Sequence, residues 1–283
     1  MHRTQEITVL NMDWLILDVS YLAYRNFHAM GQLAHEGVGT AVAYGIFRDV
    51  SELKDRFGVD NVAFAFDRGR PLRTALLATY KGERRKNAKE NPEVAEARKE
   101  VHEQIKRMHR TLLPEAGYRN ILSAEGFEAD DIIAKVVIEH TDKSFIIVAA
   151  DSDLYQLLDS RTSMWNPSKK KLLTETWFRN AYGLSPIQWG DVKALAGCSS
   201  DNVPGIEGVG EKTAVKYLSG ALSTGKVFER IVHHHQLWQR NLQLVRLPYQ
   251  GTPSFDLVPD RVTARSEGAV LDSLGIRSLR TRR

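Results

Sequence analysis

Five carboxylates in one stretch of the sequence have the types and spacing to hold a divalent metal ion. Three lie at the start of an apolar helical pattern, and two follow the apolar run at residues 145–149. These residues are Glu128, Asp130, Asp131, Asp151 and Asp153. Crowded carboxylates raise one another's pKa and resist ionisation, and a bound cation removes that penalty. Because oxygen ligands suit Mg²⁺ or Mn²⁺, the sequence predicts a metal site.

A simpler explanation covers only part of this cluster. Acidic side chains are favourable at any helix N-terminus because of the helix dipole, which accounts for Glu128, Asp130 or Asp131 taken singly. It does not account for Asp151 and Asp153, which follow a strand-like run. We therefore prefer the metal site.

The elements that would position these side chains repeat one pattern, an apolar strand followed by an aspartate. Residues 14–17 lead to Asp18 and residues 62–66 lead to Asp67. Buried parallel strands are continuous apolar runs, and open α/β sheets place ligands at the carboxyl ends of their strands. Apolar spacing over residues 41–57 predicts a covering helix. We expect an α/β fold with a mostly parallel central sheet flanked by helices.

A basic segment follows at residues 80–110. Its surplus of Lys and Arg over Glu equals the net charge of the whole chain, +4. Residues 92–114 have the spacing of a long amphipathic helix, whose charges fit an ordinary solvated face. Residues 80–89 lack an apolar face, so we expect a basic arch, within residues 80–115, that holds phosphates, with Tyr80 available for base stacking.

A glycine-rich segment at residues 197–218 predicts a helix-hairpin-helix element. Pro204, Gly205, Gly208 and Gly210 prevent regular structure between two helical patterns. Glycines let backbone N–H groups approach a phosphate at a helix N-terminus, where Lys212 and Thr213 would add a charge and a hydroxyl. The segment is not a Walker loop, because it lacks that spacing and follows no strand. Asp201 at its entry adds one more carboxylate.

Composition limits the class of protein. The 283 residues are 42% hydrophobic and 26% charged, which is typical of a globular protein. No apolar stretch reaches membrane-spanning length, and a single cysteine, Cys198, excludes an internal disulfide and fits a reducing cytoplasm. Met12 directly precedes the first strand and is a possible start of translation. We expect an α/β domain at residues 12–185 and a helical region that carries the glycine hairpin at residues 186–283.

Six motifs in order give the sequence a specific resemblance. They are LILDVSYLAYRNFHA around Asp18, AFAFD ending at Asp67, YKGERR from Tyr80, EGFEADD ending at Asp131, AADSD ending at Asp153, and SSDNVPGIEGVGEKTA from Ser199. Together they resemble the 5′ nuclease family, which comprises flap endonucleases, phage 5′-3′ exonucleases and the 5′ nuclease domain of bacterial DNA polymerase I. The resemblance covers the chain from Trp14 to about Leu247.

The resemblance implies a PIN-like α/β fold with a helix-three-turn-helix, and metal-dependent hydrolysis of DNA with 5′ flaps or 5′ ends. Such a protein acts in DNA replication and repair. One or two ions of Mg²⁺ or Mn²⁺ would bind, and K⁺ would bind at the glycine hairpin. The implied ligands of the first metal are Asp18, Asp67, Glu128, Asp130, Asp131 and Asp151, and those towards the second are Asp153 and Asp201.

Other roles follow from the same resemblance. The implied catalytic residues are Lys81, Arg84, Asp67 and Asp130, with Lys81 and Arg84 holding the scissile phosphate. The implied DNA-binding residues are Tyr24, Arg25, Tyr80, Lys81, Arg84, Arg85, Gly208, Gly210, Lys212 and Thr213. No polymerase domain follows in the sequence, so the expected protein is a free-standing monomer in the cytoplasm, with a separate DNA polymerase as a partner.

One position departs from the family pattern. The expected sequence is Gly-Asp-x-x-Asp-Asn, whereas this chain has Cys198 in place of the first aspartate. A thiol is a poor ligand for Mg²⁺, so the second metal site is expected to be weaker. Cys198 therefore keeps open a DNA-structure binding protein with weakened catalysis. The acidic α/β fold keeps open a second alternative, a metal-dependent ribonuclease of similar fold.

Overall fold

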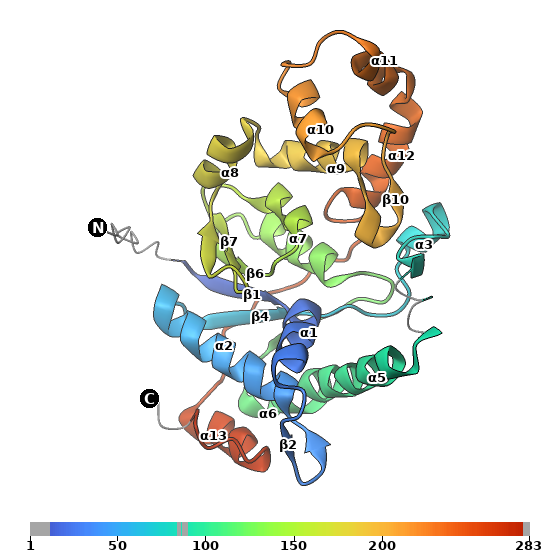
Figure 1. The fold of residues 1–283 in the computed structure, drawn as a ribbon. Coiled ribbons are helices and arrows are strands. Elements are labelled where there is room, and N and C mark those ends of the chain that lie inside the picture. Colours follow the sequence, from blue (N-terminus) through green and yellow to red (C-terminus); the bar gives the residue numbers. More distant parts are fainter. Residues whose placement is uncertain (1–11, 84–85, 87–89, 280–283) are drawn as a thin grey trace, which may run out of the picture.

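The centre of the protein is a six-stranded sheet in the order β5-β4-β1-β6-β7-β8 (Figure 1). The computed structural model describes residues 12–83, 86 and 90–279. The strands are β1 (Trp14–Asp18), β4 (Asn61–Ala65), β5 (Asn120–Leu122), β6 (Phe145–Val148), β7 (Thr162–Asn166) and β8 (Lys171–Leu173). Neighbouring strands are parallel except β7 and β8, which are antiparallel. The predicted α/β fold with a mostly parallel sheet is confirmed.

The register of the strands brings their carboxyl ends to one edge. Asp18 at the end of β1 pairs with Ala65 at the end of β4, and Leu17 pairs with Val148 at the end of β6. Every residue of β1 and β6 is buried, as expected for strands that are covered on both faces. The polar residues that follow these strands therefore emerge side by side.

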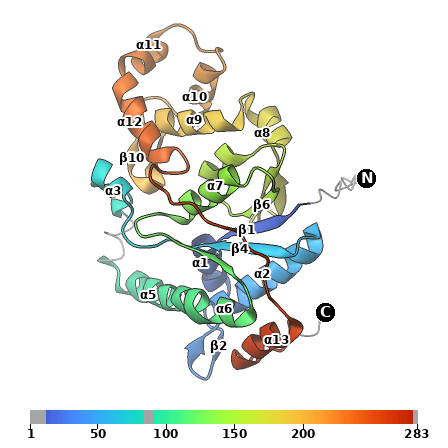
Figure 2. The ribbon, with the colours of Figure 1, turned by 180° about the vertical axis from the view of Figure 1, so that it is seen from behind.

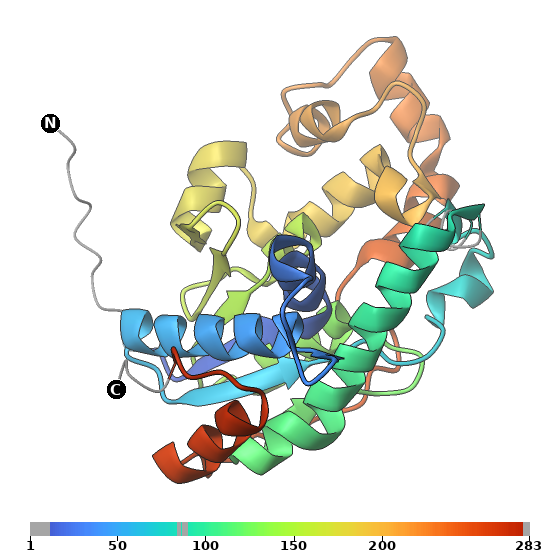
Figure 3. The same cartoon turned by 60° about the horizontal axis from the view of Figure 1, so that its bottom comes forward.

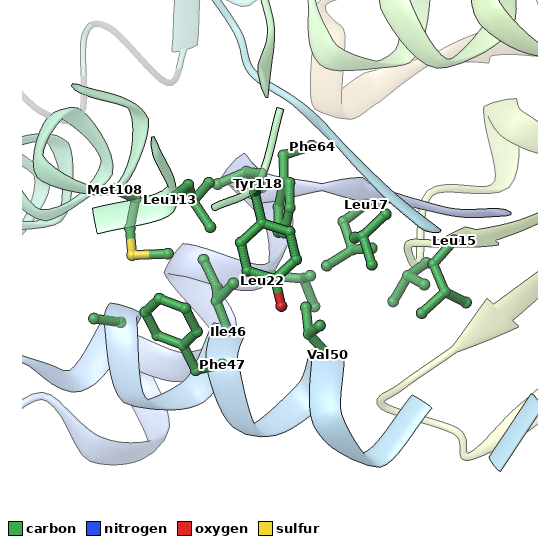
Figure 4. Packing of buried hydrophobic residues seen from close by; sticks show 14 of the residues in the cluster. Leu15, Leu17, Leu22, Ile46, Phe47, Val50, Phe64, Met108, Leu113 and Tyr118 are labelled. Carbon is green, nitrogen blue, oxygen red and sulfur yellow. The ribbon is translucent and has the colours of Figure 1, made fainter. Parts of the chain in front are cut away.

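Helices cover both faces of the sheet. Along β1, side chains alternate, so that Leu15 and Leu17 belong to one hydrophobic cluster and Ile16 to the other. The first cluster, part of which is shown in Figure 4, includes side chains from helices on one face. These helices are α1 (Val19–Met30), α2 (Ala41–Phe57), α5 (Pro92–Arg107), α6 (Leu113–Ala116) and α13 (Ala264–Ser273). Figure 3 shows α2, α5 and α13 on this face.

The second cluster joins the opposite face of the sheet to a different set of helices. Its sheet-side members include Ile16 and Ile147, and Trp189 is one of its largest fully buried side chains. The covering elements are α7 (Ala129–Glu139), the 3₁₀ segment η2 (Ser152–Leu157), α8 (Glu175–Tyr182), the short 3₁₀ turn η3 (Pro186–Gln188) and α9 (Trp189–Ala196).

The predicted helix at residues 92–114 is present, but it contains a π-helical turn. Helix α5 begins after Asn91, whose side chain accepts hydrogen bonds from the amides of Glu93 and Val94 at 3.1 and 3.3 Å. It continues through the π turn η1 (Met108–Leu112) into α6. The π turn ends two residues before Pro114, which lacks the N–H that an α-helix would use.

A compact group of helices follows α9. A small antiparallel pair, β9 (Gly197–Cys198) and β10 (Val203–Pro204), flanks the 3₁₀ turn η4 (Ser199–Asp201). Helices α10 (Glu211–Leu218), α11 (Lys226–His233) and α12 (His235–Val245) come next. Both α10 and α12 pack against α9. The remaining elements are the hairpin of β2 (Ala34–His35) and β3 (Val38–Gly39), and the short helix α3 (Arg73–Leu76).

The chain then returns to the sheet. Residues 246–262 run back past its edge, where Asp260 accepts hydrogen bonds from the amides of Val62 and Arg119 at 3.0 and 2.9 Å. Helix α13 packs against α6, and Figure 2 shows the return in red. The sequence pattern assigns residues 186–283 to one helical region, whereas packing places α13 in the first hydrophobic cluster. Nowhere in the described part of the chain is a helix long and apolar enough to cross a membrane.

Candidate active site

Two aspartates fix the sheet edge to the helices that begin there. The amide of Tyr21 donates a hydrogen bond of 2.9 Å to Asp18 Oδ1, so Asp18 caps α1. The amide of Ala129 donates a hydrogen bond of 2.7 Å to Asp67 Oδ1, which joins the residue after β4 to the start of α7. These two hydrogen bonds attach both aspartates to the starts of helices at the same edge of the sheet.

Carboxylates at this edge of the sheet raise one another's pKa. Burial, together with Asp67 and Asp151, raises the pKa of Asp18 to about 7. Burial, followed by Asp151 and Asp18, raises the pKa of Asp130 well above its usual range. Burial and Asp151 raise the pKa of Asp153 to about 6, against the opposing effect of a neighbouring lysine. The structure therefore brings these predicted side chains together at one site.

Asp130 is a member of this group with an unsatisfied carboxylate oxygen. Its Oδ1 atom is buried and, among the described residues, has no hydrogen-bond partner. Asp130 lines a small cavity of about 20 Å³, which is large enough for one water-sized occupant. The other polar residues that line this cavity are Arg73, Tyr80, Glu128, Asp153 and Asp201. A buried oxygen without a partner beside a polar cavity fits a metal ligand.

Arg73, which the sequence pattern does not single out, lies beneath the cluster. Its guanidinium forms two hydrogen bonds to Asp131, at 2.5 and 2.7 Å, and a third to Glu128 at 3.2 Å. Its Nε donates to the carbonyl of Leu244 at 2.7 Å, and the group lies over the ring of Tyr249. Burial lowers the pKa of Arg73, but the hydrogen bonds and the negative charge of Asp131 raise it by more. The pKa of Arg73 therefore lies above its usual value. No local pattern marks this residue, because its partners are distant in sequence.

Asp131 is fully engaged inside the protein. It is 0% exposed, and besides Arg73 it accepts hydrogen bonds from the amides of Tyr249 and Glu128, at 2.8 and 3.2 Å. Glu128 and Asp131 also form the capping box of α7. Both oxygens of Asp131 therefore hold the start of the helix and its buried arginine.

The interpretation of Tyr80 as a base-stacking residue is wrong. Its ring is buried, with 4% of the residue exposed, so neither face is open to a base. Its hydroxyl donates a hydrogen bond of 2.8 Å to Glu128 and lies 3.4 Å from Asp201. Burial and these two carboxylates raise its pKa far above the usual range, so the hydroxyl stays protonated. Tyr80 supports the carboxylates from inside.

Lys81 reaches the acidic cluster, and its contact with the reacting phosphate stays a prediction. Its ammonium pairs with Glu128 and lies 3.9 Å from Asp201. Its amide donates to the carbonyl of Asp201 at 2.9 Å, and its φ angle is +51°. Burial lowers the pKa of Lys81, but the negative charges of Glu128 and Asp201 raise it by more than burial lowers it. The ammonium group is therefore cationic. Arg84 and Arg85 lie outside the described residues.

A second group of possible ligands lies towards the hairpin. One ligand atom from each of Asp153, Cys198 and Asp201 lies within 4.8 Å of the other two. Lys193, also not predicted, forms ion pairs of 3.2 Å with Asp153 and 3.0 Å with Glu211. Burial and Asp201 raise the pKa of Cys198, so its thiol is protonated at neutral pH when no cation is bound.

The glycine hairpin has the geometry predicted for it. A Cβ added at Gly205 would lie 2.1 Å from the carbonyl oxygen of Ala196, so this position requires glycine. Gly208 has a φ of +76°, and Gly210 directly precedes α10 with open space around it. Gly208, Gly210 and Lys212 are exposed and Thr213 is half-buried. The N-terminus of α10 therefore faces solvent, where backbone N–H groups can meet an anion.

Helix α1 carries the two other predicted DNA contacts. Arg25 is half-buried and forms an ion pair of 2.8 Å with Asp49 of α2. Tyr24 is half-buried and its ring lies near those of His28 and His102. Both residues sit on the helix that Asp18 caps, and Arg25 is already bound within the protein. Their contacts with DNA stay predictions.

Comparisons with known proteins agree with this geometry. Residues 13–183 match the family described as "5′-3′ exonuclease, N-terminal resolvase-like domain", and residues 184–246 match "5′-3′ exonuclease, C-terminal SAM fold". Thermostable DNA polymerase I of Thermus aquaticus is 34% identical over 208 residues, which cover 72% of this chain and 23% of that protein. The chain thus spans about a quarter of the length of this relative.

Solved structures share the fold. A structure of 5′-exonuclease from phage T5, described as having zinc ions bound, has a TM-score of 0.72 at 20% identity and covers 92% of this chain and 98% of that one. A flap endonuclease from the same phage, described in a complex with DNA and metal ions, has a TM-score of 0.71 at 19% identity, with 93% and 99% covered. With family matches running from residue 13 to residue 246, the chain belongs to the 5′-3′ exonuclease family.

Proposed function

We propose that the protein is a metal-dependent 5′ nuclease that hydrolyses phosphodiesters in DNA with 5′ flaps or 5′ ends. The observation that carries this proposal is the excess of negative charge at the sheet edge. Asp18, Asp130 and Asp153 all have raised pKa values in the protein alone. A site that resists ionisation without a cation is suited to bind one, and the family match supplies the reaction class.

The carboxylates divide into two sets by their neighbours. Beyond the effect of burial, the first set raises the pKa values of its own members: Asp67 and Asp151 raise that of Asp18, and Asp151 and Asp18 raise that of Asp130. A first ion of Mg²⁺ or Mn²⁺ would be held by these four residues, Asp18, Asp67, Asp130 and Asp151. Asp153 and Asp201 would lie towards a second. When bound, such an ion lowers the pKa of its water and stabilises charge on the phosphate. The free Oδ1 atom of Asp130 fits a direct ligand of the first ion.

The surrounding residues would position these ligands and the substrate. Asp131, whose oxygens are occupied by Arg73 and amides, would hold the start of α7 in place of its predicted role as a ligand. Glu128 is shared by Arg73, Tyr80 and Lys81, so it would link the ligands to the base of the arch. Lys81 would turn from Glu128 towards the scissile phosphate and stabilise its charge.

The hairpin before α10 would hold duplex DNA through its backbone. Exposed N–H groups at a helix N-terminus bind phosphate without reading base sequence. We therefore expect affinity that depends on DNA shape and falls as salt rises. Carbonyl groups of the same turn would hold K⁺, and replacing K⁺ with Li⁺ at constant ionic strength should weaken duplex binding. An unchanged affinity would remove K⁺ from the proposal.

Cleavage of a labelled 5′-flap DNA over a titration of Mg²⁺ or Mn²⁺ tests the proposed function. We expect Asp130→Asn to reduce cleavage by at least about 100-fold, the scale on which one electrostatic group contributes to a transition state. Asp142→Asn is the control, because Asp142 is exposed and pairs with Lys143 away from the cluster. Equal loss in both variants, or cleavage that does not need a divalent ion, would contradict the proposal.

A DNA-structure binding protein is the second candidate, and Cys198 favours it. This residue removes one oxygen ligand from the second set. If the wild type binds flap DNA tightly and never cuts it in either metal, whereas Cys198→Asp cuts it, the binding protein is the correct assignment. Cutting by the wild type rejects this candidate.

The polymerase partner is also part of the proposal. Support comes from the relative in Thermus aquaticus, in which the matching region makes up 23% of a DNA polymerase. A separate DNA polymerase that makes the 5′ flap should raise the rate of cleavage on a gapped duplex. An unchanged rate in its presence would remove this partner.

A further inference from the structure

The second ligand group is a three-residue site with mixed chemistry. Asp153 comes from η2, Cys198 from β9 and Asp201 from η4, and one ligand atom of each lies within 4.8 Å of the others. In a tetrahedral site with metal–sulfur and metal–oxygen bonds of about 2.3 and 2.0–2.2 Å, a sulfur and an oxygen ligand lie about 3.6 Å apart. Only a small movement would therefore bring all three onto one ion.

The surroundings of this site already hold positive charge. Lys193 is 7% exposed, and its ammonium contacts Asp153 at 3.2 Å. Asp153 and Asp201 also line a small polar cavity, and Asp153 Oδ1 is buried and, apart from its ion pair with Lys193, makes no hydrogen bond within the described residues. A polar cavity lined by a ligand oxygen that lacks a hydrogen bond is a second observation, independent of the cysteine, that indicates a cation.

The types of ligand determine which cation the site would bind. Mg²⁺ requires oxygen ligands and near-octahedral geometry, and replacing a carboxylate with sulfur removes both a charge and a hard ligand. Thiolates select softer ions, and Zn²⁺ readily accepts a mixture of sulfur and carboxylate oxygen. The set at Asp153, Cys198 and Asp201 thus does not fit Mg²⁺ and does fit Zn²⁺.

We propose that Asp153, Cys198 and Asp201 form a site for a thiophilic divalent ion of the Zn²⁺ class, next to a site for Mg²⁺ or Mn²⁺ at Asp18 and Asp130. The protein would then bind two chemically different ions. The second would be thiophilic because Cys198 stands in its site in place of an oxygen ligand. This inference concerns the site of the proposed nuclease and rests on that function only for the use of the second ion. On binding, the thiol of Cys198 releases its proton to solvent and its sulfur bonds to the ion.

The chain permits an unusually specific measurement. Because Cys198 is its only cysteine, any thiolate-to-metal absorption must come from that residue. Co²⁺ is the probe, since it takes the place of Zn²⁺ and gives a sulfur-to-metal charge-transfer band in the near ultraviolet. Full-length protein is titrated with Co²⁺ in excess Mg²⁺ and a reductant that contains no thiol. We expect a band that saturates at one Co²⁺ per chain and disappears when Zn²⁺ is added.

Variants separate this site from other sites on the surface. Cys198→Ser should abolish the band, and Asp153→Asn should weaken Co²⁺ binding at least about tenfold, since even outer partners of ligands contribute about 10–100-fold to affinity. Asp142→Asn should change nothing. The absence of a band in the wild type, a band that needs two chains per ion, or full affinity in Asp153→Asn would each overturn the inference.

The outcome does not depend on nuclease activity. Flap cleavage in Mg²⁺ without a cobalt band would leave the nuclease in place and reject the thiolate site. A stoichiometric band in a protein that cuts no DNA in any metal would establish the site and reject the nuclease. Cys198→Asp should lose the band and gain Mg²⁺ affinity, which calorimetry in a buffer free of other divalent ions would detect.

Discussion

At the residue scale, the crowding of carboxylates has a consequence for stability that can be measured. The pKa of Asp18 is raised to about 7 by burial and by Asp67 and Asp151. A carboxyl with a raised pKa binds more protons in the folded chain than in the unfolded chain. Its contribution to the free energy of unfolding is therefore present at low pH and lost as the pH rises towards 7.

The matched variant Asp18→Asn isolates this contribution. With a chelator present, the free energy of unfolding of the wild type should fall relative to that of Asp18→Asn between about pH 4 and pH 7. The expected fall is on the order of 1–4 kcal/mol, because one pKa unit corresponds to about 1.36 kcal/mol. Urea unfolding across this range measures the difference. Mg²⁺ should restore the wild type at pH 7 and leave the variant almost unchanged. A difference that is constant with pH would contradict the assignment of this charge.

Arg73 offers a second prediction at this scale. Arg73→Met leaves Asp131 buried without its partner, and breaking a buried ion pair costs about 3–5 kcal/mol. The exposed pair of Arg68 and Glu125, at 3.1 Å, is the control, and Arg68→Met should cost less than about 1 kcal/mol. Denaturant unfolding compares the two.

The double variant Arg73→Met with Asp131→Leu separates ion pairing from packing. Because the second change removes the unpaired charge, we expect it to recover part of the lost stability. If the double variant is less stable than Arg73→Met alone, Asp131 contributes mainly through its bonds to the amides of Tyr249 and Glu128.

At the element scale, the hairpin before α10 contains two glycines with different roles. Gly205→Ala would place Cβ 2.1 Å from a carbonyl oxygen of α9, so we expect a loss of about 1–3 kcal/mol in stability. Gly210→Ala meets no atom within 4 Å. It should keep stability and weaken duplex DNA binding, because its methyl group would lie between the backbone N–H groups and a phosphate.

Thermal unfolding and DNA binding together distinguish these roles. If Gly210→Ala binds duplex DNA as tightly as the wild type at low salt, DNA does not approach the N-terminus of α10. If Gly205→Ala unfolds at the same temperature as the wild type, the close contact with Ala196 is relieved by a shift of the hairpin. Either outcome would change the hairpin assignment.

Lys193 connects three elements, because it lies on α9 and pairs with Asp153 of η2 and Glu211 of α10. Lys193→Met should tighten Co²⁺ or Mn²⁺ binding several-fold, since it removes an internal cation that competes for Asp153. Lys216→Met, at an exposed position of α10, is the control. Weaker metal binding in Lys193→Met would show that the lysine organises the ligands.

At the scale of the whole molecule, patterns over neighbouring residues predicted the fold and most of the acidic residues at its edge. Each apolar strand followed by an aspartate is a local signal, and parallel pairing brings the ends of β4, β1 and β6 together. The roles of Arg73, Lys193 and Tyr80 depend on partners far away in sequence. Tyr80 was misinterpreted because an aromatic residue in a basic segment has the same sequence pattern whether it is buried or exposed.

The return of the chain to the sheet after α12 could not be predicted from the sequence, because residues 246–262 contain no helix or strand. Asp260 accepts hydrogen bonds from two backbone amides at the sheet edge. Asp260→Ala should therefore leave these amides unsatisfied and cost about 1–3 kcal/mol in denaturant unfolding. Asp256→Ala, at an exposed position of the same segment, is the control. Equal stability of the two variants would show that α13 alone holds the segment.

This return gives the molecule two covalent connections between the sheet and the helices that carry the hairpin. The first leads into α9, and the second leads from α12 back to α13. A body held by two connections has less freedom to move than a body held by one. Any opening of the helices that carry the hairpin away from the carboxylates must therefore stretch or bend both connections at once.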